Sequence, residues 1–189
     1  MLLAAGASRR FGADKRAHTM GGGQSLLHTT IEKYIRCFEQ VVVVLRPDDQ
    51  ALADALVEHF GTRAPRVVIA TNAALGMGHS LAAGIAAIDD WDHAFIALAD
   101  MPFVQTDTIE KLKAAMAGAS GNAIIQPTFN GRPGHPVGFG HHHFAALLAL
   151  SGDAGARSVV MRCNDDVVEV AVQDQGVIRD VDKPADLDD

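Results

Sequence analysis

Short apolar runs alternate with amphipathic segments along the first two thirds of this 189-residue chain. Residues 41–45 (VVVVL) form a continuous, largely β-branched run, which is typical of a strand covered on both faces. Similar runs at 67–70, 94–99 and, more weakly, 123–126 predict three further strands. The intervening segments have helical spacing and predict helices over these ranges: 25–36, 48–60, 78–88 and 107–117.

Strands that alternate with helices through short connections predict right-handed crossovers and a mostly parallel sheet. We therefore expect a three-layer α/β/α fold of the Rossmann-like type. The last third differs, because residues 131–140 are rich in Gly and Pro, 144–150 and 156–162 have helical patterns, and 167–172 alternate. The chain contains no obvious linker, so residues 1–189 are expected to form a single domain.

Composition narrows the classes of function. Apolar residues make up 48% of the chain, which predicts a folded core rather than disorder. The 16 basic and 23 acidic residues give a net charge of −7, so neither a nucleic-acid partner nor a basic membrane-binding surface is expected. No apolar run approaches the ~18 residues of a transmembrane helix. Cys37 and Cys163 show no CxxC spacing, and we expect a cytoplasmic location.

The loop at residues 3–15 is the first candidate site, because ligands of parallel sheets bind outside the carboxyl ends of the strands. Gly6 and Gly12 allow backbone N–H groups to approach a ligand closely, and the cations Arg10 and Lys15 follow. This combination suits a triphosphate, although the spacing is not that of a P-loop. A glycine-rich turn with solvated charges is the alternative interpretation.

Two acidic segments are candidates for a metal site. Asp100 ends the apolar run 94–99, where a buried carboxylate is costly unless a cation compensates it. Asp180 and Asp182 alternate on what we expect to be a short strand near the C-terminus. Each segment also fits a simpler interpretation, in which Asp100 caps a turn before Pro102 and the second segment is an acidic turn.

Two histidine-containing segments are candidates for a functional role. The run His141–His143 is expected to be a solvated loop that binds no metal, because adjacent side chains cannot easily supply a tetrahedral set and no Cys or acidic partner is evident. His135 is held between Gly134 and Pro136 in a rigid turn. A functional and a structural role are equally compatible with that position.

Several segments together resemble the MobA-like NTP transferase family, and within it the branch that joins CTP to molybdopterin. The matching segments, spread across nearly the whole chain, are LAAGASRRFGADK at 3–15, TN at 71–72, GMGHSL at 76–81, DMP at 100–102, RPGHPV at 132–137, GDAGAR at 152–157 and DVDKPADL at 180–187. After Lys15, however, the family's apolar run is replaced by Arg16-Ala17-His18-Thr19.

The resemblance implies an Mg²⁺-dependent transfer of CMP from CTP to the phosphate of molybdopterin, with release of pyrophosphate. It implies catalytic roles for Arg10, Lys15 and Asp100, and Mg²⁺ binding by Asp100 and Asp182. The implied nucleotide-binding residues are Leu3, Ala4, Ala5, Gly6, Ser8, Arg10, Lys15, Asn72, Gly76 and Ser80. The implied acceptor-binding residues are Arg132, His135, Asp153 and Arg157. A molybdoenzyme or its chaperone is the implied recipient of the product.

Other functions remain open at this point. Ala5 favours cytosine over guanine, because its Cβ fills space that a purine needs, but a GTP-using enzyme or one with a different acceptor has the same motifs. A non-catalytic nucleotide-binding protein is a further alternative. A dinucleotide-dependent oxidoreductase is disfavoured, because no GxGxxG follows the first strand.

Overall fold

The computed structural model describes residues 1–6 and 11–187. Within these residues eight strands form one mixed sheet in the order β3-β2-β1-β4-β7-β5, with β6 and β8 also paired to β5. The strands are β1 (Leu2–Leu3), β2 (Val42–Leu45), β3 (Arg66–Ile69), β4 (His93–Leu98), β5 (Ile124–Phe129), β6 (Arg132–Pro133), β7 (Val137–Gly140) and β8 (Val167–Ala171). The first four strands are parallel, as are β5 and β8, whereas β7 runs antiparallel to both β4 and β5.

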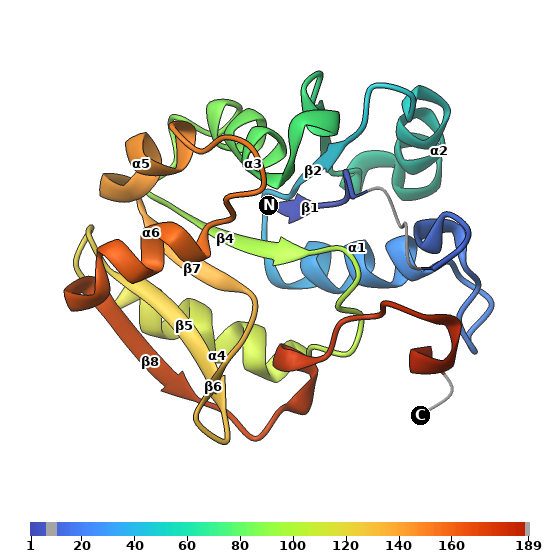
Figure 1. Ribbon diagram of the computed structural model, residues 1–189. Coiled ribbons are helices and arrows are strands. Elements are labelled where there is room, and N and C mark those ends of the chain that lie inside the picture. Colours follow the sequence, from blue (N-terminus) through green and yellow to red (C-terminus); the bar gives the residue numbers. More distant parts are fainter. Residues whose placement is uncertain (7–10, 188–189) are drawn as a thin grey trace.

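Helices cover both faces of the sheet, which confirms the predicted three-layer architecture (Figure 1). They are α1 (Leu26–Cys37), α2 (Gln50–Phe60), α3 (Met77–Ala86), α4 (Thr106–Ala117), α5 (Phe144–Leu148) and α6 (Arg157–Arg162). Their starts follow local signals. Ser25 caps α1 by accepting a hydrogen bond from the His28 N–H, and Asp107 lies in the first turn of α4, where the helix dipole favours a negative charge.

Alternation along the strands divides the core between the two faces. In β2, Val43 and Leu45 pack with α1 and α2, whereas Val42 and Val44 pack with α3 and α5 on the opposite face. All four residues of β2 are buried, as a continuous apolar run predicts for a central strand. Helix α4 packs beside α1 and covers β5 and β7 on the same face.

Residues 131–140, for which no element was predicted, form an antiparallel return in which β7 inserts between β4 and β5 (Figure 1). Two local expectations differ from the structure. Residues 179–182 form no strand; they run extended, and the Val181 N–H donates to the Asp100 carbonyl at 2.9 Å. The run His141–His143 forms a 3₁₀ turn, η4, that buries His143, so the expected solvated loop is wrong there.

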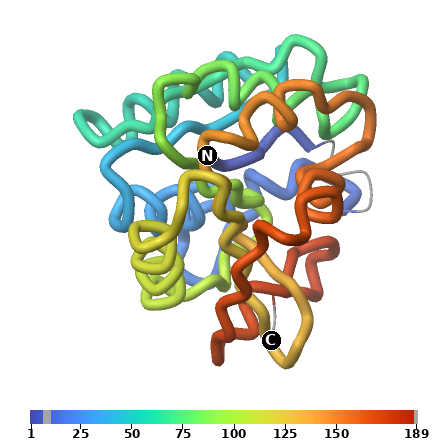
Figure 2. Tube along the Cα trace, turned by 90° about the vertical axis from the view of Figure 1, so that its left-hand side faces the viewer, coloured from blue at the N-terminus to red at the C-terminus, as the bar shows by residue number. Residues whose placement is uncertain are grey.

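The last third of the chain completes the sheet. Strand β8 pairs with β5 over its whole length, from Ile124 opposite Val167 to Thr128 opposite Ala171. Figure 2 shows the two segments side by side, with the red C-terminal part of the chain continuing past the end of β5. This continuation carries residues 179–183 to the loop that follows β4.

Candidate active site

A cavity of about 620 Å³ lies at the carboxyl ends of β1, β2 and β4. Its position follows from topology: the chain leaves β1 toward β2 on one side and returns to β4 on the other, which opens a crevice between the connecting loops. The volume falls in the range of small-molecule sites, about 300–1,000 Å³. The cavity therefore lies at the edge of the sheet where the sequence analysis expected a ligand to bind.

Nine of the residues proposed from the sequence line this cavity: Leu3, Ala5, Gly6, Lys15, Gly76, Ser80, Asp100, Asp153 and Asp182. Five others do not line it: Ala4, Asn72, Arg132, His135 and Arg157. Ser8 and Arg10 lie outside the described residues, so their proposed roles are carried by the sequence alone.

Lys15 brings the two candidate metal carboxylates together. Its Nζ lies 2.6 Å from Asp100 Oδ2 and 3.7 Å from Asp182 Oδ1, and it donates to the Val181 carbonyl at 2.8 Å. The two aspartates are 82 positions apart in the sequence (182 minus 100). The extended segment after residue 178 brings Asp182 to the end of β4, because the Val181 N–H pairs with the Asp100 backbone.

The donor set of this cluster fits a hard divalent cation. Asp100 Oδ1 is buried and has no hydrogen-bond partner among the described residues, although the same carboxylate contacts Lys15 through Oδ2. A buried acceptor without a partner is costly, and coordination of a cation satisfies it. Asp100 and Asp182 are therefore suitable ligands for Mg²⁺ or Mn²⁺, both of which prefer oxygen donors.

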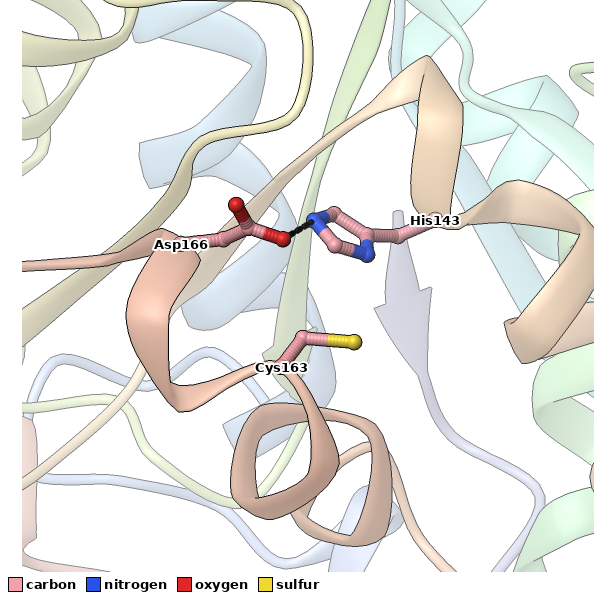
Figure 3. A group of neighbouring side chains, drawn as sticks. All are labelled: His143, Cys163 and Asp166. Atoms are coloured by element: carbon pink, nitrogen blue, oxygen red, sulfur yellow. Dashed lines mark ion pairs between the residues drawn. The ribbon is translucent and has the colours of Figure 1, made fainter.

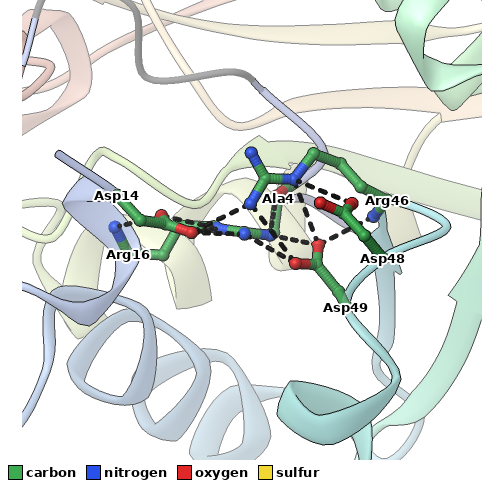
Figure 4. Close-up of polar contacts among 6 residues, drawn as sticks. All are labelled: Ala4, Asp14, Arg16, Arg46, Asp48 and Asp49. Atoms are coloured by element: carbon green, nitrogen blue, oxygen red, sulfur yellow. Dashed lines mark hydrogen bonds and ion pairs between the residues drawn. The ribbon is translucent and has the colours of Figure 1, made fainter. Parts of the chain in front are cut away.

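A buried ionic network supports the loop that follows β1 (Figure 4). Arg16 is only 5% exposed; its guanidinium pairs with Asp49, which is 7% exposed, and with Asp14. The same guanidinium donates to the Ala4 carbonyl at 2.9 Å, and Arg46 joins the network by contacting Asp14 at 2.9 Å. The residue that departs from the family's apolar run thus occupies the interior and fixes the backbone of the predicted nucleotide loop.

The segment 76–81, which the resemblance assigns to the nucleotide and which begins α3, is in direct backbone contact with the predicted acceptor segment. Gly78 N–H donates to the Gly152 carbonyl at 2.8 Å. Gly76 has φ +124°, and a Cβ there would lie 2.2 Å from the Gly152 carbonyl. Glycine is required at position 76 for both reasons. Asp153, next in the chain, reaches the cavity from this contact.

His135 lies beside the cavity rather than in its wall. Its backbone N–H donates to the Val177 carbonyl at 2.8 Å, and the absence of a side chain at Gly134 permits this approach. Burial lowers the pKa of His135, partly offset by a hydrogen bond to the Ile96 backbone and by the charges of Asp100 and Asp180. A neutral imidazole is therefore favoured there.

Eight further residues that were not proposed from the sequence line the cavity, among them Phe11, Arg46, Asp48 and Met77. Arg46 and Asp48 directly follow β2, so the rule about carboxyl ends of strands was sufficient to find them. Phe11 and Met77 carry no signal beyond their place in segments that were already selected.

The described residues thus form an α/β protein with a nucleotide-sized cavity at the carboxyl ends of its parallel strands, lined by a lysine and two aspartates. A family model for the MobA-like NTP transferase domain matches residues 1–167. The chain belongs to this family and is a transferase enzyme of the nucleotidyltransferase class, as the resemblance implied.

Named relatives span several activities. The chain is 32% identical to nicotine blue oxidoreductase of Paenarthrobacter nicotinovorans, in a match that covers 83% of this chain and 78% of that protein. It is 29% identical to the bifunctional protein GlmU of Azorhizobium caulinodans over 82% of its own length, but it spans only about a third (32%) of that relative.

Solved structures share the fold. Rv0371c from Mycobacterium tuberculosis H37Rv aligns with a TM-score of 0.82 at 25% identity, over 98% of this chain and 93% of that one. The same protein in complex with manganese aligns with a TM-score of 0.73 at 22% identity, over 90% and 85% of the two chains. Among the described residues of the present chain, no helix is both long and apolar enough to span a bilayer.

Proposed function

We propose that this protein is a divalent-metal-dependent cytidylyltransferase that transfers CMP from CTP to the phosphate of molybdopterin and releases pyrophosphate. The observation that carries the proposal is the Lys15–Asp100–Asp182 cluster in the wall of the cavity. Such a cluster suits the triphosphate of a nucleotide, because a cation and metal-binding carboxylates neutralise charge that develops on the leaving phosphates.

In the proposed reaction, a phosphate oxygen of the acceptor forms a bond to the α-phosphorus of CTP. The bond from that phosphorus to the oxygen bridging to the β-phosphate breaks, and its electron pair leaves with pyrophosphate. The acceptor is already anionic, so no general base is needed. Lys15 offsets the negative charge of the departing group, and Arg10 is proposed to act with it. A bound Mg²⁺ or Mn²⁺, held by Asp100 and Asp182, would supply further electrostatic stabilisation.

The nucleotide is proposed to lie against the backbone of Leu3, Ala4, Ala5 and Gly6, with Ser8 beside it. Ala5 lines the cavity, and its Cβ is proposed to take up space that a purine would need, which supports cytosine. Gly76 and Ser80 form the facing wall, and Asn72 is proposed to approach the base from the preceding turn. CTP, rather than GTP, is the proposed donor on this ground.

The acceptor is proposed to bind near Asp153, which enters the cavity beside Gly76. Arg132, His135 and Arg157 are proposed to contact the pterin outside the cavity wall, and the product is proposed to pass to a molybdoenzyme or its chaperone. The motif similarity at residues 132–137 and 152–157 supports this assignment.

The test is an activity assay with each of the four nucleoside triphosphates and molybdopterin in the presence of Mg²⁺ or Mn²⁺. Asp100→Asn keeps the shape of the side chain and removes its charge, and it should reduce turnover by a few powers of ten. Asp107→Asn, which removes an exposed carboxylate from the start of α4, is the matched control. A near-wild-type rate for Asp100→Asn would exclude the proposed role, and a dominant guanylyl product would exclude CTP as donor.

A second candidate is supported by the similarity to nicotine blue oxidoreductase, which covers most of both chains. In that case the protein would catalyse a redox reaction instead of nucleotidyl transfer. Two assays distinguish the functions: release of pyrophosphate from CTP, and a change in the absorbance of nicotine blue in the presence of an added reductant. A redox change that requires the protein, without release of pyrophosphate, would favour the second candidate.

A further inference from the structure

A group of three side chains with metal-binding chemistry lies away from the cavity (Figure 3). His143 ends the η4 turn, Cys163 follows α6, and Asp166 ends the short 3₁₀ turn η5 (Asn164–Asp166). One ligand atom from each residue can be chosen so that all three lie within 4.8 Å of one another. His143 is buried, and the other two side chains are partly buried.

The position of this cluster in the fold separates it from the active site. Gly140 directly precedes the η4 turn and pairs with His93 at the amino end of β4. Ile124 and Val167 pair at the amino ends of β5 and β8. The cluster therefore lies at the amino ends of the parallel strands, whereas the cavity lies at their carboxyl ends, and none of the three side chains lines that cavity.

Asn122 orients two of the three groups. Its backbone carbonyl lies 2.6 Å from His143 Nε2, and its side-chain amide donates to Asp166 Oδ1 at 2.5 Å. The second carboxylate oxygen, Oδ2, lies 3.5 Å from His143 Nε2. Asp166 and Cys163 are also held relative to each other, because the Asp166 N–H donates to the Cys163 carbonyl at 3.0 Å. Supporting hydrogen bonds of this kind commonly orient metal ligands.

We propose that His143, Cys163 and Asp166 form a zinc site. Imidazole nitrogen, thiolate sulfur and carboxylate oxygen are the three donor types that Zn²⁺ accepts, and the thiolate selects zinc over Mg²⁺. With metal–ligand bonds of about 2.0–2.3 Å, tetrahedral ligands lie about 3.5 Å apart, so the cluster needs to contract by at most about 1.3 Å. Water completes the fourth position.

Bound zinc would join three segments that meet only through tertiary structure: the η4 turn, the end of α6 and the start of β8. The expectation that the run His141–His143 binds no metal assumed that no Cys or acidic ligand lies nearby, and the fold brings one of each to His143. Zinc binding here does not depend on the proposed transferase activity, so either proposal can fail without the other.

The experiment is a zinc titration of untagged protein, freed of metal by chelation and kept reduced, in excess Mg²⁺ so that oxygen-only sites are occupied. Competition with a chromophoric zinc chelator gives the stoichiometry and the affinity. We expect one Zn²⁺ per chain, at least a 10-fold weaker affinity in Cys163→Ser and His143→Gln, and a zinc-dependent rise in Tm that both variants lose.

Two controls separate a site from non-specific binding. His142→Gln removes the exposed neighbour of His143, and Cys37→Ser removes the other cysteine, which lies outside the cluster. Both should retain the wild-type affinity. If His143→Gln does not fold, Cys163→Ser alone decides the matter, with zinc-dependent protection of Cys163 from a thiol reagent in the wild type as a second readout. Absence of stoichiometric binding, or equal affinity in Cys163→Ser, would overturn the proposal.

Discussion

Replacement of Arg16 by leucine removes the cation at the centre of the network beneath the β1 loop. In the wild type the Arg16 guanidinium contacts Asp49, Asp14 and the Ala4 carbonyl, and both Arg16 and Asp49 are less than 10% exposed. Loss of one partner of a buried pair costs about 3–5 kcal/mol, because the other charge stays buried. Arg46 still reaches Asp49, through its backbone N–H at 2.9 Å and its guanidinium at 3.3 Å, so we expect the lower end, about 3 kcal/mol.

Urea denaturation monitored by circular dichroism measures this loss as a lower midpoint with an unchanged m-value. For a domain of this size the corresponding fall in Tm is about 6–12 °C. Because the Ala4 carbonyl also loses its donor, the KM for the nucleotide should rise in the same variant. Arg36→Leu is the matched control: it breaks the exposed pair with Glu32 and should cost at most about 0.5 kcal/mol.

The double variant Arg16→Leu/Asp49→Ala tests whether the unpaired Asp49 carboxylate causes the loss of stability in Arg16→Leu. If the cost of Arg16→Leu comes from the stranded carboxylate of Asp49, removal of that carboxylate should recover part of the lost stability, with a coupling above about 0.5 kcal/mol. The account of the network would be refuted if the double variant lost as much stability as the two single variants summed. A loss below about 1 kcal/mol for Arg16→Leu would also refute it.

Three further outcomes are expected. Gly76→Ala should cost at least about 2 kcal/mol in urea denaturation, because its Cβ would meet the Gly152 carbonyl and φ is positive, whereas Gly22→Ala, in open space, should be nearly neutral. Ala5→Gly should narrow the preference for CTP over GTP in kcat/KM without inverting it; an unchanged ratio would remove Ala5 from base selection. The pKa of His28 is lowered by burial and by the nearby His59, so the unfolded chain binds more protons and stability should fall as the pH drops below about 6.5. His28→Gln should reduce this loss of stability at low pH. A pH profile of stability identical to that of the wild type would contradict the assignment to His28.

The central elements were predictable because local sequence determines them. The run 41–45 is apolar and β-branched, and it forms β2 at Val42–Leu45. The helical spacing at 25–36 corresponds to α1 at Leu26–Cys37. Strand β7 was not predictable in the same way, because its place in the sheet depends on a pairing of Val137 with Ile96 that is 41 positions away (137 minus 96). No local pattern encodes such a register.

The candidate functional residues also divide into those marked by local sequence and those that depend on contacts between distant segments. Lys15 and Asp100 could be selected from short motifs, and the fold places them 2.6 Å apart. Arg16 is a charged residue in the interior, which is rare without a partner, and its partner Asp49 is 33 positions away. The approach of Cys163 to His143 depends likewise on tertiary packing, so the sequence alone suggested a solvated histidine run.

The insertion of β7 between β4 and β5 has a consequence for biosynthesis. Strands β1 to β4 pair in parallel among themselves, but β5 is synthesised before both of the strands that flank it, β7 and β8. A nascent chain that has emerged only to about residue 130 therefore exposes an unpaired edge on β4 and both edges of β5, which are sites of aggregation. Emergence of residues 137–140 joins the two halves of the sheet, and these non-local pairings make folding of this domain slow relative to that of a helical protein of equal length.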